Sequence, residues 1–288
     1  MPDDRRVTAG EMASIDAAVV SSDIWTEGRV PSFMKVVVQS PNLQWLQMFS
    51  AGLDNPVFAM LRDRGVLVTH AAGSSGVPIA HTVMMHLVAM CRGSRELHVA
   101  QGEHRWADRD VVDLEGRTVG IIGLGGIGSH VARLASAFGM RAIGLRRAPS
   151  GDEPCETWPT GRLHELLRVV DDLVLTAPLT AETRGMIGAA ELAALRPGAH
   201  VVNVARGELI DEPALIEALR SGHVGAAALD VFATEPLPAD SPLWDMPTVT
   251  VTPHSAGATP LAADRAAAIF LDNLGRWHRG EGLRNIGP

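Results

Sequence analysis

Residues 118–140 read TVGIIGLGGIGSHVARLASAFGM, and this stretch decides the fold. An apolar run enters it, Gly123, Gly125 and Gly128 follow in G-x-G-x-x-G spacing, and an amphipathic run leaves it. In such a strand–turn–helix unit the first glycine permits a tight turn, the second admits a pyrophosphate, and the third lets helix and strand pack closely. The helix N-terminus offers N–H groups and a positive dipole to phosphates. The flanking strand and helix favour a dinucleotide-binding turn over a tight turn without a ligand.

Outside this segment, short apolar runs alternate with stretches of helical periodicity. This alternation predicts parallel sheets with helices on both faces. The expected strands are 17–21, 46–48, 66–68, 119–122, 141–145, 173–176, 200–204, 226–230 and 249–251. The expected helices are 78–104, 129–138, 212–220 and 262–279.

The position of the glycine turn predicts the domain order. More than a hundred residues precede Gly123, so a first domain comes before the nucleotide unit. The long helical stretches 78–104 and 262–279 flank the central block, which indicates that the block is inserted into the first domain. We expect a Rossmann-type doubly wound parallel sheet at 89–259, inserted into a smaller flavodoxin-like α/β substrate domain built from 1–88 and 260–288.

Composition narrows the class of protein. With 288 residues, 46% hydrophobic and 20% charged, the chain can bury a large core, and disorder is not expected. A net charge of −8 argues against nucleic acid or an anionic membrane as the main partner. No run approaches the ~20 apolar residues of a membrane span, and the first residues lack the apolar core of a secretory signal. Two cysteines, Cys91 and Cys155, suit a reducing cytoplasm, where we expect the protein to be.

The strand after the glycine turn ends unusually. About twenty residues beyond the glycines, NAD-binding units carry an acid that binds the ribose 2′-hydroxyl. Here the sequence RAIGLRR ends in Arg146 and Arg147, and the first acids are Asp152 and Glu153. Guanidinium groups bind a 2′-phosphate that a carboxylate would repel. The pair favours NADP, with NAD as the alternative cofactor; the plainer interpretation is solvated arginines at a strand end.

Three later stretches each follow a predicted strand and each carry one reactive group. They are NVARGELID (203–211), LDVFATEPLP (229–238) and TVTPHSAGAT (250–259). Reducing a ketone by hydride requires a group that holds the substrate and a group that donates a proton. Arg206 suits the first task, because its planar fork is permanently charged. His254 suits the second, since an ordinary histidine titrates near pH 6.5, and Glu235 can favour its charged form.

These stretches, with LQWLQMFSAGLDN (43–55) and APLTAETRGMIG (177–188), resemble the D-isomer-specific 2-hydroxyacid dehydrogenases, especially the glyoxylate and hydroxypyruvate reductase branch. The similarity runs from about residue 43 to residue 259. It implies that Arg206 binds the 2-oxo acid, that Glu235 pairs with His254, and that His254 is the acid/base. It implies a substrate-binding turn at Ser50, Ala51 and Gly52. The implied cofactor contacts are Gly123, Gly125, Ile127, Gly128, Arg146, Arg147, Pro178, Thr183, Val204, Ala205 and Asp230. Of these, Asp230 is expected to face the nicotinamide carboxamide; the alternative is that it caps a loop.

The chain also departs from this family. Only about forty residues precede LQWLQ, so we expect an opening strand–helix unit to be missing. His81 and Thr82 stand where the family often has an acid followed by histidine, which we interpret as an altered domain-interface contact. The spacings of His81, His86, His98 and His104 with Cys91 match no zinc pattern, so no metal is expected.

The sequence thus predicts an NADPH-preferring reductase of a small 2-oxo acid, forming the D-2-hydroxy acid. By resemblance it is expected to be a homodimer joined through the long helices of the nucleotide domain. One alternative is an NAD(P)H-sensing protein of the corepressor type without turnover. Another is a relative that acts on a small anion such as formate or phosphite.

Overall fold

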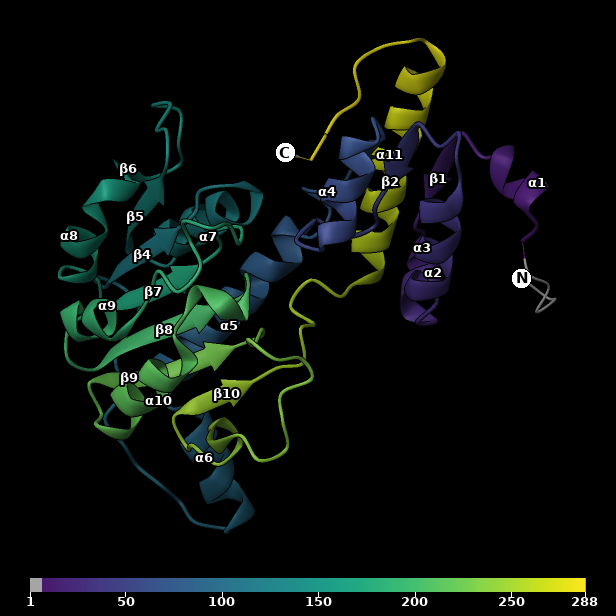
Figure 1. Cartoon of the computed structure of the whole chain (residues 1–288). Coiled ribbons are helices and arrows are strands. Elements are labelled where there is room, and N and C mark those ends of the chain that lie inside the picture. Colours follow the sequence, from purple (N-terminus) through teal and green to yellow (C-terminus); the bar gives the residue numbers. More distant parts are fainter. Residues whose placement is uncertain (1–6, 288) are drawn as a thin grey trace. The chain divides into compact units, whose positions relative to one another are not determined.

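The computed structural model describes residues 7–287 (Figure 1). The chain divides into two compact units. The terminal unit comprises Met1–Ser74 and Thr259–Pro288, and the central unit comprises Ser75–Ala258. The sequence led us to expect a boundary between residues 88 and 89. A boundary there would cut helix α5 (Gly76–Arg92). That helix counts with the central unit because Val83 and Leu87 are buried in the same core as Val131 of helix α7 (Gly126–Ala137).

A seven-stranded parallel sheet forms the central unit (Figure 1). Its order is β10-β9-β8-β7-β4-β5-β6, and every neighbouring pair is parallel. The strands are β4 (Thr118–Ile122), β5 (Arg141–Arg146), β6 (Glu156–Pro159), β7 (Asp172–Leu175), β8 (Ala199–Asn203), β9 (Val224–Leu229) and β10 (Val249–Val251). Strand order reverses at β4, which lies between β5 and β7. Open parallel sheets bind ligands at such a switch point, beyond the carboxyl ends of the strands.

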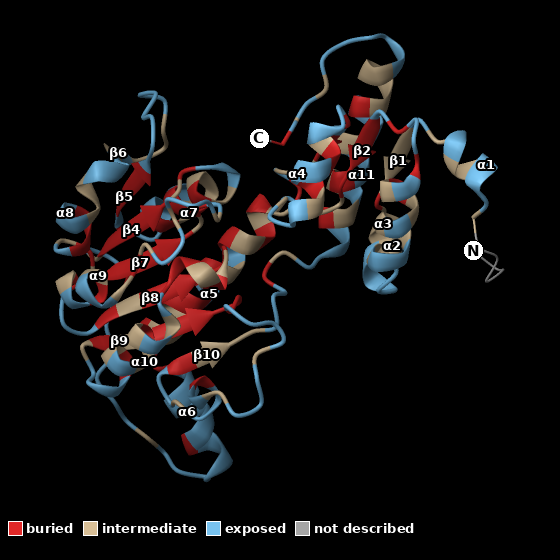
Figure 2. Ribbon diagram, in the orientation of Figure 1, coloured by how far each residue is buried: buried red, intermediate tan, exposed pale blue. Residues whose placement is uncertain are grey.

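The inner strands of this sheet, such as β4 and β7, are buried on both faces (Figure 2). Leu173 and Leu175 point into one apolar core, whereas Val174 between them points into the other. Helices α5 and α7 supply the core that contains Val174. The opposite core is covered by α8 (Leu163–Leu167), α9 (Ala189–Ala194) and α10 (Glu212–Arg220). This two-sided burial explains why the strands read as continuous apolar runs.

The prediction of one helix over 78–104 is wrong. Helix α5 ends at Arg92, Gly93 takes a left-handed conformation with φ 60°, and α6 (Ser94–Gly102) begins after it. A side chain at Gly93 would also collide with Arg109, whose guanidinium carbon lies 2.3 Å from the position of a Cβ. Glycine in this conformation is a common helix stop, and here it redirects the chain.

The terminal unit is a small parallel sheet with helices. Its strands are β1 (Ala17–Val19), β2 (Trp45–Gln47) and β3 (Leu67–Thr69), in that order. Its helices are α1 (Ala9–Ala13), α2 (Ser22–Thr26), α3 (Val30–Gln39), α4 (Pro56–Asp63) and α11 (Pro260–His278). The end of the described chain returns to this sheet, where Ile286 forms an antiparallel bridge with Thr69. Over residues 7–287, no helix combines the length and apolar character that a bilayer crossing requires.

A buried polar network ties α11 to the small sheet. Asn273 is fully buried; its amide donates to Gln47 Oε1 at 3.1 Å and to the Arg284 carbonyl at 3.1 Å, and its oxygen accepts from the Arg284 N–H at 2.8 Å. Gln47 Oε1 also accepts from the Thr69 hydroxyl at 2.8 Å. Trp45 stacks on Phe270 and Trp277 of the same helix. The network therefore joins three segments that are distant in sequence.

We predict that Asn273→Ala lowers the free energy of unfolding by about 2–4 kcal/mol, because buried partners lose their hydrogen bonds. Urea denaturation of the full chain measures the change. Asp264→Ala, at an exposed position of the same helix, is the matched control and should change stability by less than about 0.5 kcal/mol. Equal stability of the two variants would show that the network does not stabilise the unit.

Candidate active site

The glycine turn joins β4 to α7, and two of its glycines are required by the protein itself. Gly123 has φ 98°, and a Cβ there would lie 2.7 Å from the Ala177 backbone. A Cβ on Gly128 would lie 2.0 Å from the Gly123 carbonyl oxygen. That oxygen accepts a 2.5 Å hydrogen bond from the Thr176 hydroxyl at the end of β7. The turn is thus fixed against the neighbouring strand.

Gly125 differs from the other two glycines. Its φ of −80° suits any residue, and a Cβ there would meet no described atom within 4 Å. The open space faces the first turn of α7, where the backbone N–H groups have no partner within the helix. Half-buried Ile127 lies in the same turn. The residues present therefore fit a pyrophosphate, which would use the space that the missing side chain leaves.

This contrast between the glycines predicts different effects of alanine. Gly128→Ala should lower the free energy of unfolding by about 3 kcal/mol, because its Cβ overlaps backbone. Gly125→Ala should change it by less than about 0.5 kcal/mol, since the Cβ enters open space. Gly125→Ala should nevertheless weaken dinucleotide binding, measured by fluorescence titration, by about tenfold or more. Binding equal to that of the unsubstituted chain would mean that the ligand does not use this space.

The two arginines lie at the end of β5, beside β4. Arg146 is paired with Glu153, with 2.9 Å between Nη1 and Oε1. Arg147 is exposed and makes no hydrogen bond or ion pair to residues 7–287. Pro178 and Thr183 lie beyond β7 on the other side of β4, where the Thr183 hydroxyl donates to the Pro178 carbonyl at 2.8 Å. The predicted cofactor residues thus follow the strands on both sides of the switch point.

Three neighbouring strands each lead into a residue of the predicted site. Arg206 follows the end of β8 by three residues, and Asp230 follows β9 directly. His254 follows the end of β10 by three residues. Because β8, β9 and β10 are adjacent and parallel, these residues leave the sheet at one edge. It is the edge at which the glycine turn lies.

His254 and Glu235 form a hydrogen-bonded pair. The distance from His254 Nδ1 to Glu235 Oε2 is 2.8 Å, and Glu235 Oε1 accepts from the Phe232 N–H at 3.0 Å. A carboxylate can only accept, so Nδ1 carries the hydrogen. Nε2 then remains available to exchange a proton with a ligand, and the His254 side chain is 51% exposed.

The backbone of His254 is held in an unusual conformation by Asp230. His254 has φ 50°, and its N–H donates to the Asp230 carbonyl at 2.8 Å. The buried Asp230 carboxylate accepts from the Thr252 hydroxyl at 2.5 Å and from the N–H groups of Ser255 and Ala256 at 2.9 and 3.0 Å. A left-handed non-glycine residue is strained and persists only where its surroundings impose it. Asp230 therefore caps the loop; its contact with a nicotinamide stays a prediction.

Arg206 is positioned by a residue that the sequence interpretation missed. Asn203, the last residue of β8, donates to the Arg206 carbonyl at 2.8 Å and accepts from the Ala205 N–H at 3.1 Å. Next to Arg206, a Cβ on Gly207 would lie 1.9 Å from the Phe232 carbonyl carbon. The turn thus packs backbone against backbone on the segment that leads to Glu235. A polar residue ending an apolar strand was the available signal for Asn203.

Other predicted positions are placed as follows. Val204 and Ala205 are buried between β8 and Arg206. Ser50, Ala51 and Gly52 form a turn after β2 in the terminal unit, where the Ser50 hydroxyl donates to the Gly52 carbonyl at 3.1 Å. Their binding roles stay predictions.

At the opposite edge of the central sheet, Cys91, Asp172 and His200 bring ligand-type atoms within 4.8 Å of one another. Asp172 is fully buried and accepts from Arg117 at 2.8 and 2.9 Å and from His200 at 2.9 Å. Burial raises the pKa of the Cys91 thiol to about 11, so the thiolate that binds metals is disfavoured. The arginine supplies the positive charge that the buried carboxylate needs, which makes the cluster a structural ion pair.

Comparison with known proteins adds independent findings. The family described as D-isomer specific 2-hydroxyacid dehydrogenase, NAD binding domain, matches residues 84–256. D-3-phosphoglycerate dehydrogenase of Methanocaldococcus jannaschii is 34% identical over 255 residues, which are 87% of this chain and 48% of that protein. The chain thus spans about half the length of that relative.

Other relatives are covered more fully. Glyoxylate/hydroxypyruvate reductase B of Pectobacterium atrosepticum is 35% identical over 283 residues, covering 94% of this chain and 88% of that protein. Among solved structures, an NADPH-dependent glyoxylate/hydroxypyruvate reductase from Sinorhizobium meliloti, in complex with NADP and sulfate, superposes with a TM-score of 0.81 at 31% identity. That match covers 95% of this chain and 85% of the other.

Proposed function

Since the chain belongs to the D-isomer specific 2-hydroxyacid dehydrogenase family, we propose that it reduces a small 2-oxo acid of the glyoxylate or hydroxypyruvate type to the D-2-hydroxy acid. NADPH is the proposed cofactor, with NADH as the alternative. The observation that carries the proposal is the His254–Glu235 pair, with 2.8 Å between nitrogen and oxygen, at the sheet edge of the glycine turn. A proton donor at that edge is what reduction of a carbonyl requires.

Each residue of the site has a distinct task in this reaction. Bound NADPH would supply the hydride to C2 of the substrate. Arg206 holds the substrate carboxylate with its planar fork and polarises the carbonyl. His254 Nε2 delivers the proton to the carbonyl oxygen as the alcohol forms. Glu235 accepts the hydrogen bond of the Nδ1–H and so orients the ring, while the Phe232 N–H fixes Glu235 itself.

The cofactor preference rests on the end of β5. Arg146 and Arg147 present cationic groups where an NAD-specific unit has a carboxylate. The Sinorhizobium meliloti structure with NADP supports this preference for a chain of the same fold. By resemblance, the turn at Ser50, Ala51 and Gly52 is assigned to the substrate carboxylate. A cytoplasmic location stays a prediction.

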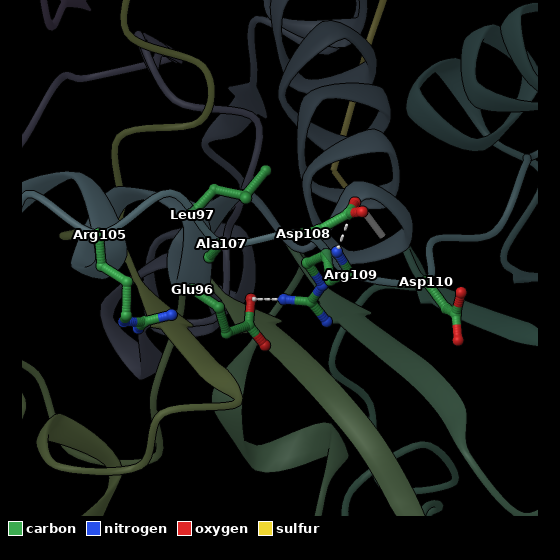
Figure 3. Close-up of a pocket in the computed structure, with 7 residues that line it drawn as sticks. All are labelled: Glu96, Leu97, Arg105, Ala107, Asp108, Arg109 and Asp110. Carbon is green, nitrogen blue, oxygen red and sulfur yellow. Dashed lines mark hydrogen bonds and ion pairs between the residues drawn. The ribbon is translucent and has the colours of Figure 1, made fainter.

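We also propose a homodimer joined through residues 94–112, a segment that begins with α6. Trp106, after this helix, is 98% exposed, and Val99 and Val112 are 51% and 48% exposed. Figure 3 shows the pocket at the base of this segment, where Glu96 and Arg109 pair at 3.0 Å. A nearly fully exposed tryptophan with apolar neighbours is typical of a surface that a partner covers. A second copy of the chain is the occupant that the family resemblance favours.

We predict that Trp106→Glu combined with Val99→Glu shifts the protein from dimer to monomer in sedimentation velocity, because two charges then enter an apolar contact. Phe138→Glu is the matched control, since Phe138 is 46% exposed at the far end of α7 and should leave the mass unchanged. A dimeric double variant would place the interface elsewhere.

We predict that His254→Asn lowers kcat by about 10²–10⁴-fold through loss of the proton donor, with little change in NADPH affinity. NADPH oxidation is followed with glyoxylate, hydroxypyruvate and bulkier 2-oxo acids. His164→Asn is the matched control, because His164 also pairs with a glutamate, Glu191, at 3.3 Å outside the site.

Two results would count against the proposal. Near-normal turnover by the His254 variant would remove this residue from proton transfer. Tight NADPH binding by the unsubstituted chain without turnover of any 2-oxo acid would favour the NAD(P)H-sensing alternative.

A further inference from the structure

The loop after β5 is organised around one carboxylate. The side chain of Glu153 is only 4% exposed. Its Oε1 accepts from Arg146 Nη1 at 2.9 Å, from the Ser150 N–H at 2.7 Å and from the Ser150 hydroxyl at 2.9 Å. Its Oε2 accepts from the Gly151 N–H at 2.8 Å. Four donors therefore converge on Glu153 and close the loop into a ring.

The Glu153 carboxylate at the centre of this ring is ionised near neutral pH. Hydrogen bonds, the largest effect being that of the Ser150 N–H, lower the pKa of Glu153 to about 2. The ionised carboxylate fixes one end of the Arg146 guanidinium, while the Arg146 side chain stays 44% exposed. Arginine carries five N–H donors, so the bond to Glu153 leaves others for a ligand.

We propose that Glu153 is a positioning residue that determines the cofactor preference. It holds Arg146 and the Ser150–Gly151 turn in place, so that the remaining N–H groups of Arg146, together with Arg147, receive the 2′-phosphate of NADPH. The inference rests on the proposed function and deepens it.

Two physical effects support this role. A long arginine side chain loses conformational freedom when it binds a phosphate, and prior fixation by Glu153 removes that loss from the binding step. The carboxylate would repel a nearby phosphate if it faced it bare. Here three loop donors and the guanidinium surround it, so its charge is largely compensated within the loop.

The opposite role for Glu153 gives the contrary expectation. A carboxylate that merely occupied the donors intended for the phosphate would act as an internal competitor. Its removal would then tighten NADPH binding. Substitution of Glu153 therefore separates the two roles by the sign of its effect.

The test uses Glu153→Gln in the full chain, with dissociation constants for NADPH, NADH and 2′,5′-ADP measured by titration calorimetry. We expect the constant for NADPH to rise about tenfold or more, as for loss of a charge-assisted bond. The dissociation constant for NADH should change less than about twofold, since NADH carries a 2′-hydroxyl in place of the 2′-phosphate. The kcat at saturating NADPH should stay within about twofold, because the hydride-transfer groups are untouched.

Asp152→Asn is the matched control. Asp152 is exposed and makes no hydrogen bond to the described residues, so the variant removes the same charge from the same loop without opening the ring. It should leave both cofactor constants within about twofold. Ser150→Ala is a milder second variant, because it removes the hydroxyl donor and keeps the backbone N–H. We expect it to raise the dissociation constant for NADPH severalfold and to leave that for NADH unchanged.

The outcomes are distinguishable from failure of the proposed function. If the unsubstituted chain binds 2′,5′-ADP no tighter than 5′-AMP, the NADPH preference itself fails and this inference falls with it. If it binds 2′,5′-ADP more tightly, the inference alone is overturned by either of two results in Glu153→Gln. These are tighter NADPH binding, and an unchanged ratio of the NADPH and NADH dissociation constants, whether or not both constants rise.

Discussion

The carboxyl ends of all strands in a parallel sheet lie at one edge, and the arrangement of this site depends on that constraint. The glycine turn, Arg206 and His254 are far apart in sequence, yet each leaves the sheet at this edge. Helices in the connections between the parallel strands cover both faces of the sheet and bury an apolar core on each. The buried sheet thus sets the position of the proposed active site, although its core residues do not belong to that site.

Side-chain to backbone hydrogen bonds then fix the loops beyond that edge. Asn203 holds the Arg206 turn, Asp230 holds the loop of His254, and Glu153 holds the loop after β5. Asn203 ends β8, Asp230 follows β9, and Glu153 lies in the loop between β5 and β6; each bonds backbone groups outside the sheet ladder. Polar residues at or beyond the ends of strands therefore join the rigid sheet to the loops that carry the proposed reactive groups.

The sequence predicted the scaffold better than the connections. Every predicted strand is present, and α10 begins after its Asp211 cap as expected, because apolar periodicity and capping are local signals. Strand β6 was not predicted, since Glu156–Pro159 is short, partly exposed and polar. The reactive groups could be proposed because each has a distinctive side chain. The bonds of Asn203 and Glu153, and the close approach of Gly207 to Phe232, depend on packing that no periodicity encodes.

The left-handed backbone at His254 has a practical consequence for trapping a substrate complex. Most side chains resist φ near 50°, so a replacement chosen only for chemical inertness would tend to relax the loop that Asp230 holds. Asparagine visits this region more readily than other non-glycine residues. Among non-glycine replacements, His254→Asn therefore removes the imidazole at the smallest conformational penalty, which makes it the natural choice for crystallising the ternary complex of the proposed reaction.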